Sequence, residues 1–516
     1  MPQMNRARQH WLFGLALAGA IAVRVLVMLA FRPVMWFGGD SASYLATGLR
    51  LVPDPSRVGG YGFLLWLLRP LHSFVAVAAV QHAMGLGIGV LVYLLARRYG
   101  LPGWAATLAT LPVFFDAYQL QLEQDMTPDI SFAFLAVLAL YLLLRWPGSV
   151  PAAAGAALAL GVTAIFWPVG LVLLAVVLVM LGLRLLKVLL GRATTGGSGT
   201  AGLAGAALAG ALVCGAIPVL GYAAWFDVHE HQFTLTRSDG VFLWSRTMSF
   251  ADCAVIKPPA DERWLCPPPG PRQAASLYIW NTGPLMREPS SQRFTARTNS
   301  LTLNFALRAI AAQPGGYVTA VGHDLLLSFY WNRPVHPDAN IVDRYQFADA
   351  GTAWVSPSLR EPGGGTVAGD QAAYAGRPSP TRAVQPFARW LIDYQQWVYL
   401  RGTLLGVILL GGLGVMLARR RGNRGGPGGR VSPVEAAGLP WVFAVTILVV
   451  PVLTADFDLR YLVPAVPVAC LAAALACAPG NRTWTTSPAA TATSDADDLT
   501  TSLPSESTST ASPDST

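Results

Sequence analysis

Charged side chains crowd the loop that follows the first apolar segment, in the stretch "VMWFGGDSASYLATGLRLVPDPSRVGGYGFLL". Asp40 follows two glycines, which allow a ligand to approach the backbone closely, and Tyr44 lies about one helical turn further on. A carboxylate in such a place can accept a proton from a hydroxyl group or bind a cation. The alternative is a structural role, because Asp is a good N-cap for the short helix predicted by "SASYLATGLRL".

Several arginines stand close to this acid and call for a negatively charged partner. Arg57 lies in a turn, between "PDPS" and "GGYG", and a guanidinium group can bind a phosphate through two parallel hydrogen bonds. We therefore predict that Arg57 binds phosphate, with Arg24 and Arg460 as further candidates. The alternative is that the arginines of this loop reach toward lipid headgroups.

A second group of acids lies in "FFDAYQLQLEQDMTPDISFAF". Glu123 and Asp125 have no local structural explanation, whereas Asp129 follows Pro128 at the start of a helix, where a carboxylate also favours the positive end of the helix dipole. Together with Asp40, these acids could supply a general base and a ligand for a divalent cation such as Mg²⁺ or Mn²⁺. Their spacing does not specify a metal.

The elements that carry these residues are expected to be membrane helices. The chain has 516 residues, of which 53% are hydrophobic and 12% charged, and it contains several apolar runs long enough to cross a bilayer. We predict about ten spans, at roughly 11–31, 72–96, 101–116, 128–145, 151–167, 169–190, 201–225, 397–418, 436–454 and 460–478. The first could instead be a signal peptide, but its length and Arg24 favour a span.

The net charge of +8 has a membrane explanation. Most basic residues flank the spans on one side, so the positive-inside rule predicts a multi-pass plasma-membrane protein with both termini in the cytoplasm. The acids of the two loops then face outward. This arrangement argues against a nucleic-acid partner.

Residues 227–396 are predicted to form one extracytoplasmic mixed α/β domain. The stretch "FTLTRSDGVFLW" alternates as a strand does, and "NSLTLNFALRAIAAQ" has helical spacing that ends at "PGG". The full prediction is an N-terminal transmembrane half at 1–226 with outer loops 32–71 and 116–128, the outer domain, C-terminal helices at 397–478, and a disordered cytoplasmic tail at 479–516. "GGSG" and "RRRGNRGGPGGR" are expected to be flexible links.

Two cysteines of the outer domain, Cys253 and Cys266, could form a disulfide. An extracytoplasmic setting permits the bond, and a loop of this size would stabilise the fold by roughly 3 kcal/mol. Two unpaired thiols are the alternative. The five cysteines of the chain show no CxxC spacing, which argues against a zinc site.

Several motifs, taken in their order along the chain, resemble those of the GT-C superfamily of integral-membrane glycosyltransferases. "GDSASYL" is similar to the acid motif in the family's first loop, and "SRVGGYGFLLWLL" is similar to its Arg-x-x-Gly-Tyr-Pro segment, with Gly62 in place of proline. "DLRYLVPAVPVACLAAALA" resembles the last span. Trp167 stands where Arg is common, and Pro128–Asp129 stand where the family has Ser-Glu. The resemblance covers about residues 10–190 and 436–478.

The resemblance implies a fold, a reaction and partners. The fold would be a membrane all-α multi-span bundle, and the group is the one that uses polyprenyl-phosphate sugars, related to protein mannosyltransferases and aminoarabinose transferases. The enzyme would transfer a hexosyl or pentosyl group with inversion to an extracytoplasmic acceptor in the cell envelope, which could be a glycan, a lipid or a protein. Asp40 would be the base, Glu123 or Asp129 would hold a metal or the acceptor, and Tyr44, Arg57, Arg24 and Arg460 would bind substrate and phosphate.

Two other functions remain open from the sequence. A non-catalytic scaffold for envelope assembly could keep the fold without the chemistry, and Trp167 is compatible with this alternative. A transporter of lipid or sugar would need charged residues near the membrane midplane, where only Arg24 comes close.

Overall fold

The structure is a computed structural model that describes residues 2–195, 198–349, 356–360, 363–422 and 432–479. The predicted disordered tail lies outside the described residues, apart from its first residue. Parts of the two predicted flexible links, at 196–197 and 423–430, also lie outside them.

Seven described helices are long and apolar enough to cross a membrane. Each coincides with a predicted span. They are α1 (Pro2–Ala30), α4 (Phe74–Arg98), α10 (Val169–Thr195), α11 (Ser198–Glu230), α21 (Gly402–Gly422), α22 (Pro433–Thr454), and α23 (Leu462–Cys477) together with the short η4 (Leu459–Tyr461).

The other three predicted spans are not among these seven long helices. The stretch 101–116 forms two short helices, α5 (Gly103–Leu108) and α6 (Leu111–Phe115), each of which begins at or next to a proline. Proline lacks the N–H that would continue a preceding helix, so one long span does not form. The stretches 128–145 and 151–167 form α8 (Asp129–Arg145) and α9 (Val150–Phe166), of 17 residues each.

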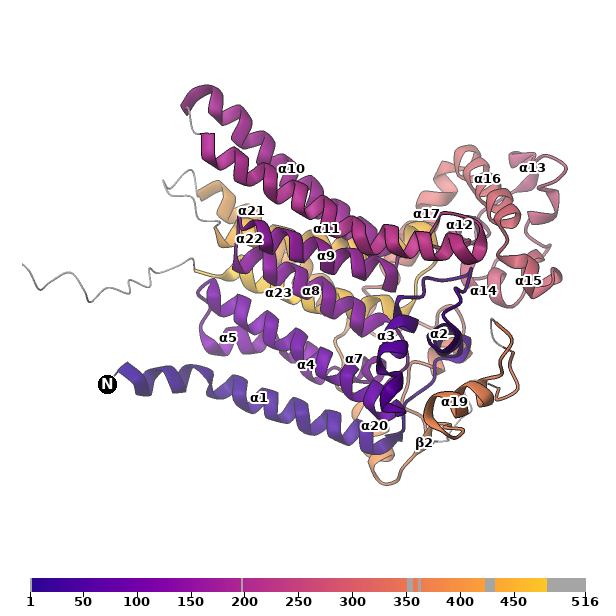
Figure 1. The fold of residues 1–516 in the computed structure, drawn as a ribbon, viewed down its shortest axis with the longest axis horizontal. Helices are drawn as coiled ribbons and strands as arrows, with labels where there is room; N and C mark the ends of the chain where they lie inside the picture. The colour runs from indigo at the N-terminus through magenta and orange to yellow at the C-terminus, as the bar shows by residue number, and fades with distance from the viewer. Residues whose placement is uncertain (1, 196–197, 350–355, 361–362, 423–431, 480–516) are drawn as a thin grey trace, which may run out of the picture. The chain divides into compact units, whose positions relative to one another are not determined.

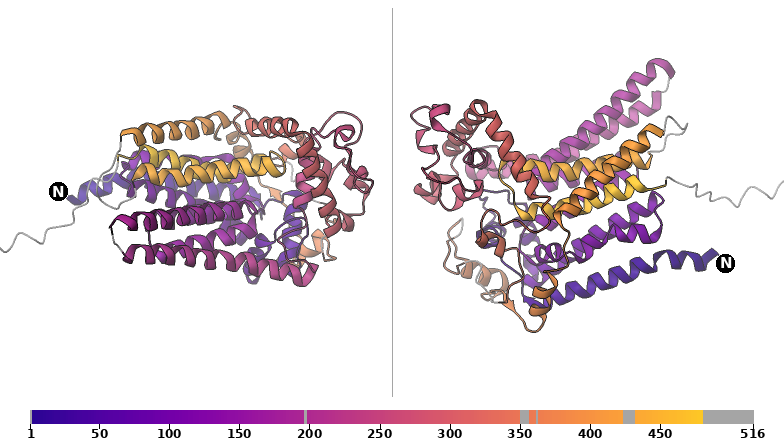
Figure 2. Two further views of the ribbon diagram at one scale, coloured as in Figure 1. Left: turned by 90° about the horizontal axis from the view of Figure 1, so that it is seen from above. Right: turned by 180° about the vertical axis from the view of Figure 1, so that it is seen from behind.

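The long helices pack through small residues. α9 lies between α8 and α11, α4 packs against α8, and α22 packs against α23. Figures 1 and 2 show these helices running side by side. A Cβ atom added at Gly161 of α9 would lie 2.3 Å from the carbonyl oxygen of Gly215 of α11, so the two backbones approach as closely as small residues permit.

The first loop and the segment 227–396, called the outer segment after its predicted location, lie at the end of the helices opposite the N-terminus (Figure 1). The first loop forms α2 (Gly38–Arg50) and α3 (Gly60–Leu68), followed by η1 (Arg69–Leu71), and α7 (Ala117–Gln124) carries the second group of acids. The outer segment contains α12 (Asp239–Thr247), α13 (Cys253–Ile256), η2 (Arg263–Leu265), α14 (Ala275–Trp280), η3 (Pro284–Arg287), α15 (Ser290–Arg293), α16 (Ala296–Ala312), α17 (Pro314–Leu327), α18 (Ala339–Asp343), α19 (Val367–Ala375) and α20 (Phe387–Tyr394).

The described part of the outer segment is helical rather than mixed α/β. The stretch predicted as strands, residues 233–244, forms a loop at 233–238 and the first part of α12 at 239–244. Trp244 of α12 packs into a helical core. The helix predicted from "NSLTLNFALRAIAAQ" is confirmed as α16, which ends just before Pro314. The described strands are two short ones, β1 (Phe31–Arg32) and β2 (Arg382–Ala383), which pair antiparallel and join the first loop to the end of the outer segment.

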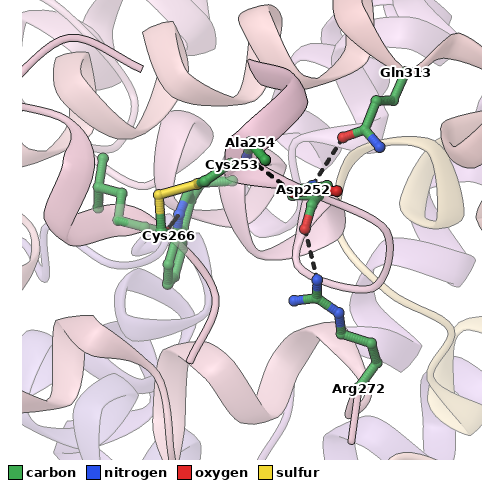
Figure 3. The surroundings of a disulfide bond; sticks show 9 residues. Asp252, Cys253, Ala254, Cys266, Arg272 and Gln313 are labelled. Carbon is green, nitrogen blue, oxygen red and sulfur yellow. Dashed lines mark hydrogen bonds between the residues drawn. A yellow bond between two sulfur atoms is a disulfide. The ribbon is translucent and has the colours of Figure 1, made fainter. Parts of the chain in front are cut away.

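The two cysteines of the outer segment are paired in a disulfide, with their Cα atoms 6.1 Å apart (Figure 3). Next to them, Asp252 caps α13 by accepting a hydrogen bond from the backbone N–H of Ala254. The N–H of Asp252 donates to the side chain of Gln313, at the end of α16. The bond therefore closes a loop that is also fastened to its neighbouring helix.

Candidate active site

Asp40 lies in the first turn of α2, with its side chain 24% exposed. It does not cap the helix, since the N-cap is Phe37, whose N–H donates to the hydroxyl of Ser41. The same hydroxyl donates to the carbonyl oxygen of Met126 and so ties the start of α2 to the second acidic loop. The prediction of a short helix is confirmed, and the prediction of an Asp40 cap is wrong. The carboxylate remains available for other partners.

Two arginines bind the two oxygens of Asp40. Nη1 of Arg57 lies 2.5 Å from Oδ1, and Nη1 of Arg460 lies 2.9 Å from Oδ2. Burial raises the pKa of the Asp40 carboxyl group, but the charges of Arg57 and Arg460 outweigh it and lower the pKa from 3.8 to about 2. At neutral pH, Asp40 is therefore a carboxylate clamped between two cations.

Arg57 is held by the turn that precedes it. Oδ2 of Asp54 lies 3.5 Å from Nε of Arg57, while Oδ1 accepts hydrogen bonds from both the N–H and the hydroxyl of Ser56. Burial lowers the pKa of Arg57, but the carboxylates of Asp40 and Asp54 raise it above its ordinary value. Asp54 is a positioning residue to which the sequence interpretation gave no role, although an Asp two residues before a turn Ser is typical of this geometry.

Aromatic rings border the same centre. The ring of Tyr44 lies 5.8 Å from Cζ of Arg57, and Trp280 of α14 lies 5.9 Å from it on the outer-segment side. Tyr44 is buried, whereas Trp280 is partly exposed. Trp167, which departs from the family pattern, stacks on Tyr461 at 4.8 Å, next to Arg460.

Arg460 joins the first loop to the second acidic loop. Its Nε lies 3.9 Å from Oδ1 of Asp129 and 4.0 Å from Oδ2 of Asp458, while its Nη1 binds Asp40. Oδ2 of Asp129 is buried without a hydrogen-bond partner among the described residues. Asp129 starts α8, as predicted. The structure thus brings together five predicted site residues: Asp40, Tyr44, Arg57, Asp129 and Arg460.

Glu123 and Arg24 do not belong to this centre. They form a fully buried pair in which Oε1 and Oε2 of Glu123 accept hydrogen bonds of 2.7 and 2.8 Å from Arg24. Gln119 donates to Oε1 at 2.8 Å, and His82 lies 2.7 Å from Oε2. With every oxygen already bound and no exposure, neither residue can meet a substrate in this arrangement. The prediction that Glu123 and Arg24 lie in one site with Asp40 is therefore wrong, because the pair links α1 to α7.

A second polar cluster was missed by the sequence interpretation. Ligand atoms of Asp324, His336 and Asp456 lie within 4.8 Å of one another, a spacing that could hold a metal ion. Arg246 already contacts Asp324 and lies 4.0 Å from Asp456, so the two carboxylates already share one cation. Burial lowers the pKa of His336, but its hydrogen bond to Asp456 outweighs this and raises it. The cluster is best described as a buried ion network.

The comparisons with known proteins give one family. Residues 69–234 match the family model described as dolichyl-phosphate-mannose-protein mannosyltransferase, and this region is about a third of the chain. It includes Glu123 and Asp129 but not Asp40, Arg57 or Arg460. The comparison with curated proteins found no match.

Two of the solved structures with some likeness are described as transferases. The S. cerevisiae protein O-mannosyltransferase Pmt1-Pmt2 complex bound to the sugar donor has 18% identity and a TM-score of 0.32, over 46% of this chain and 36% of that chain. The Archaeoglobus fulgidus oligosaccharyltransferase has 14% identity and a TM-score of 0.40, over 92% of this chain and 51% of that chain.

ArnT from Cupriavidus metallidurans, solved with undecaprenyl phosphate, has 14% identity and a TM-score of 0.34, over 89% of this chain and 76% of that chain. This chain therefore spans about half or less of the length of the first two proteins. The match to the family model agrees with the resemblance seen in the sequence: residues 69–234 of this chain are similar to the dolichyl-phosphate-mannose-protein mannosyltransferase family.

Proposed function

We propose that this protein is a glycosyltransferase that moves a sugar from a polyprenyl-phosphate donor to an acceptor on the outer side of the plasma membrane, with both of its termini in the cytoplasm. The observation that carries the proposal is the clamp of Asp40 between Arg57 and Arg460. These three residues come from the first loop and the last loop of the chain, so the fold assembles the clamp. One carboxylate beside two guanidinium groups, partly open to solvent, suits a hydroxyl acceptor and a phosphate leaving group.

The two arginines have a second role in this proposal. A carboxylate with a pKa of about 2 is a weak base. If the donor phosphate draws Arg57 toward itself, Asp40 loses one of its two cations and its pKa rises. Donor binding would then prepare the base, while Arg57 stabilises the charge that develops on the departing phosphate. Inversion at the anomeric carbon follows if the acceptor hydroxyl attacks directly, through an oxocarbenium-like transition state.

A divalent cation is a further part of the proposal and has one point of support. Oδ2 of Asp129 is buried without a partner, whereas both oxygens of Asp40 contact guanidinium groups. Asp129 is therefore the residue of this centre that could bind Mg²⁺ or Mn²⁺, and activity before and after chelation tests this. The donor sugar and the acceptor are left to experiment, and mass spectrometry of envelope glycans with and without the protein would identify them.

The decisive test is Asp40→Asn, which keeps the shape of the side chain but removes its charge and basicity. With a lipid-phosphate sugar donor, we expect turnover to fall by at least about 10²-fold. Expression and membrane insertion should remain close to those of the wild type. The melting temperature should fall only modestly, because Asp40 is partly exposed and Asp54 and Asp129 still lie beside the two arginines. Full turnover in this variant would show that Asp40 takes no part in the transfer reaction. Asp393→Asn, on an exposed side chain of α20, is the matched control.

A further inference from the structure

A pocket lies beside the outer ends of α17, α21 and α23, away from the clamp. The empty volume between its walls is about 490 Å³, a figure that includes space open to the surroundings. Leu327, Leu405 and Val466 contribute apolar walls from these three helices, and Arg333 and Tyr118 contribute polar groups. A pocket that is apolar on one side and cationic on another is suited to an amphipathic anion.

The cation of this pocket is incompletely satisfied. Cζ of Arg333 lies 3.9 Å from the ring of Tyr118 and 4.5 Å from the ring of Tyr399, so the guanidinium group is sandwiched between two aromatic faces. Among the described residues, its Nη2 is buried without a hydrogen-bond partner. The hydroxyl of Tyr118, whose residue is 6% exposed, also lacks a partner. Buried donors of this kind are normally paired, and a phosphate oxygen could accept from both.

One carboxylate lines the same pocket and must be accounted for. Asp116 accepts hydrogen bonds from the backbone N–H groups of Tyr118 and Gln119 through Oδ1 and from that of Leu400 through Oδ2. Three donors therefore already bind this carboxylate. Its charge is partly balanced within the protein, whereas Arg333 keeps a donor free.

The surroundings point to a lipid rather than a soluble anion. Tyr330 and Trp331 line the pocket and are about half exposed, as expected for aromatic side chains at a membrane interface. The wall residues Leu405 and Val466 lie near the starts of α21 and α23, and both α21 and the continuous stretch of η4 and α23 are long enough to span a membrane. We propose that this pocket binds the phosphate of an anionic membrane lipid, with Arg333 and Tyr118 donating to the phosphate and the lipid chain lying against α21 and α23.

The pocket and the clamp lie on opposite sides of one short segment. Leu459 and Leu462 line the pocket, while Arg460 between them turns to Asp40. The lipid would thus support the segment that presents Arg460, without touching the reacting groups. The proposal does not depend on the proposed transfer reaction, because it concerns binding alone.

Native mass spectrometry of the purified full-length protein tests this proposal. The delipidated protein is titrated with dioctanoyl phosphatidic acid and, separately, with dioctanoyl phosphatidylcholine. We expect one preferred phosphatidic acid molecule per protein and at least about a tenfold loss of affinity in Arg333→Gln. Arg333→Lys should retain part of the affinity, and Tyr118→Phe should weaken it. Arg389→Gln, an exposed arginine on α20, is the matched control.

Four outcomes would overturn the proposal. Equal binding of the two lipids would show that the site does not select a lipid with a net negative charge. Unchanged binding in a folded Arg333→Gln variant would show that the lipid binds elsewhere. An equal loss in Arg57→Gln would assign the lipid to the clamp. Displacement of the lipid by millimolar inorganic phosphate would show a bare anion site that does not use the lipid chain. If Arg333→Gln fails to fold, Tyr118→Phe is tested in its place, and unchanged binding of phosphatidic acid in that variant would overturn the proposal.

Discussion

Two acid–arginine pairs illustrate how residues of the same type differ in role. Asp40 is partly exposed and shares its oxygens between Arg57 and Arg460, whereas Glu123 is fully buried against Arg24. The sequence predicted both acids in loops on the same side of the membrane, and the hydrogen bond from Ser41 to Met126 ties these two loops together. The sequence could not show that Glu123 turns inward, because the direction of a side chain on the short α7 depends on how α1 packs beside it.

Asp40 should titrate at unusually low pH. Its pKa in the folded state, about 2, lies below the ordinary 3.8, so its contribution to stability is present above pH 3.8 and is lost as pH falls toward 2. In infrared difference spectra of wild type against Asp40→Asn, the carboxylate band should persist at about pH 3. In Arg57→Gln the band should fade at a higher pH, because one of the two cations is gone. Identical titration in both proteins would contradict the clamp.

Glu123→Gln should destabilise the protein instead of selectively stopping catalysis. Removing one partner of a buried ion pair leaves a buried charge, at a cost of about 3–5 kcal/mol. We expect a clearly lower melting temperature, with the loss of activity following the loss of folded protein. Asp393→Asn, on an exposed pair, should change little. An unchanged melting temperature with no turnover would show that Glu123 acts in the reaction and not in stability.

At the scale of elements, α2 and α3 explain one departure from the family pattern. Gly62 of α3 faces Thr47 of α2, and a Cβ atom at residue 62 would lie 2.7 Å from Cγ2 and 2.8 Å from Cβ of Thr47. The methyl group of Thr47 therefore occupies the space that a side chain at residue 62 would need. This compensation can be recognised only once the two helices are placed, although the departure at residue 62 is visible in the sequence.

Gly62→Ala should therefore move α2, which carries Asp40. We expect a loss of about 1–3 kcal/mol from overpacking, together with reduced turnover. The double variant Gly62→Ala with Thr47→Ala should recover part of the lost stability and part of the lost turnover, since it removes the Cγ2 methyl group of Thr47. Gly221→Ala, where an added Cβ meets nothing within 4 Å, is the control. Thermal melting and turnover of the four proteins check this, and a double variant no better than Gly62→Ala would disprove the compensation.

At the scale of the whole molecule, the sequence predicted the helical bundle well and the outer segment poorly. Long apolar runs identify spans whatever their neighbours are, and seven of them are confirmed. The stretch 101–116 was mistaken for one span because hydropathy averages over its prolines. Alternating residues near Trp244 were mistaken for strands, because the core of the outer segment decides which face is buried.

The disulfide should matter to the stability of the outer segment and not to the chemistry. Cys253→Ser opens a loop of 13 residues and should cost roughly 3 kcal/mol. We expect a lower melting temperature with turnover of the folded protein unchanged. Cys214→Ser, at a free cysteine, is the control. Wild-type melting in Cys253→Ser, or two titratable thiols in the native outer segment, would argue against the bond.

The pairing of β1 with β2 has a consequence for biogenesis. Phe31 and Arg32 emerge from the ribosome early, but their partners Ala383 and Arg382 are synthesised only after most of the protein. Arg460 follows later still. A nascent chain whose first helices are already inserted therefore still lacks Arg460, which binds one oxygen of Asp40. If the clamp carries out the proposed transfer, the protein would stay inactive until the loop between α22 and α23 has been made.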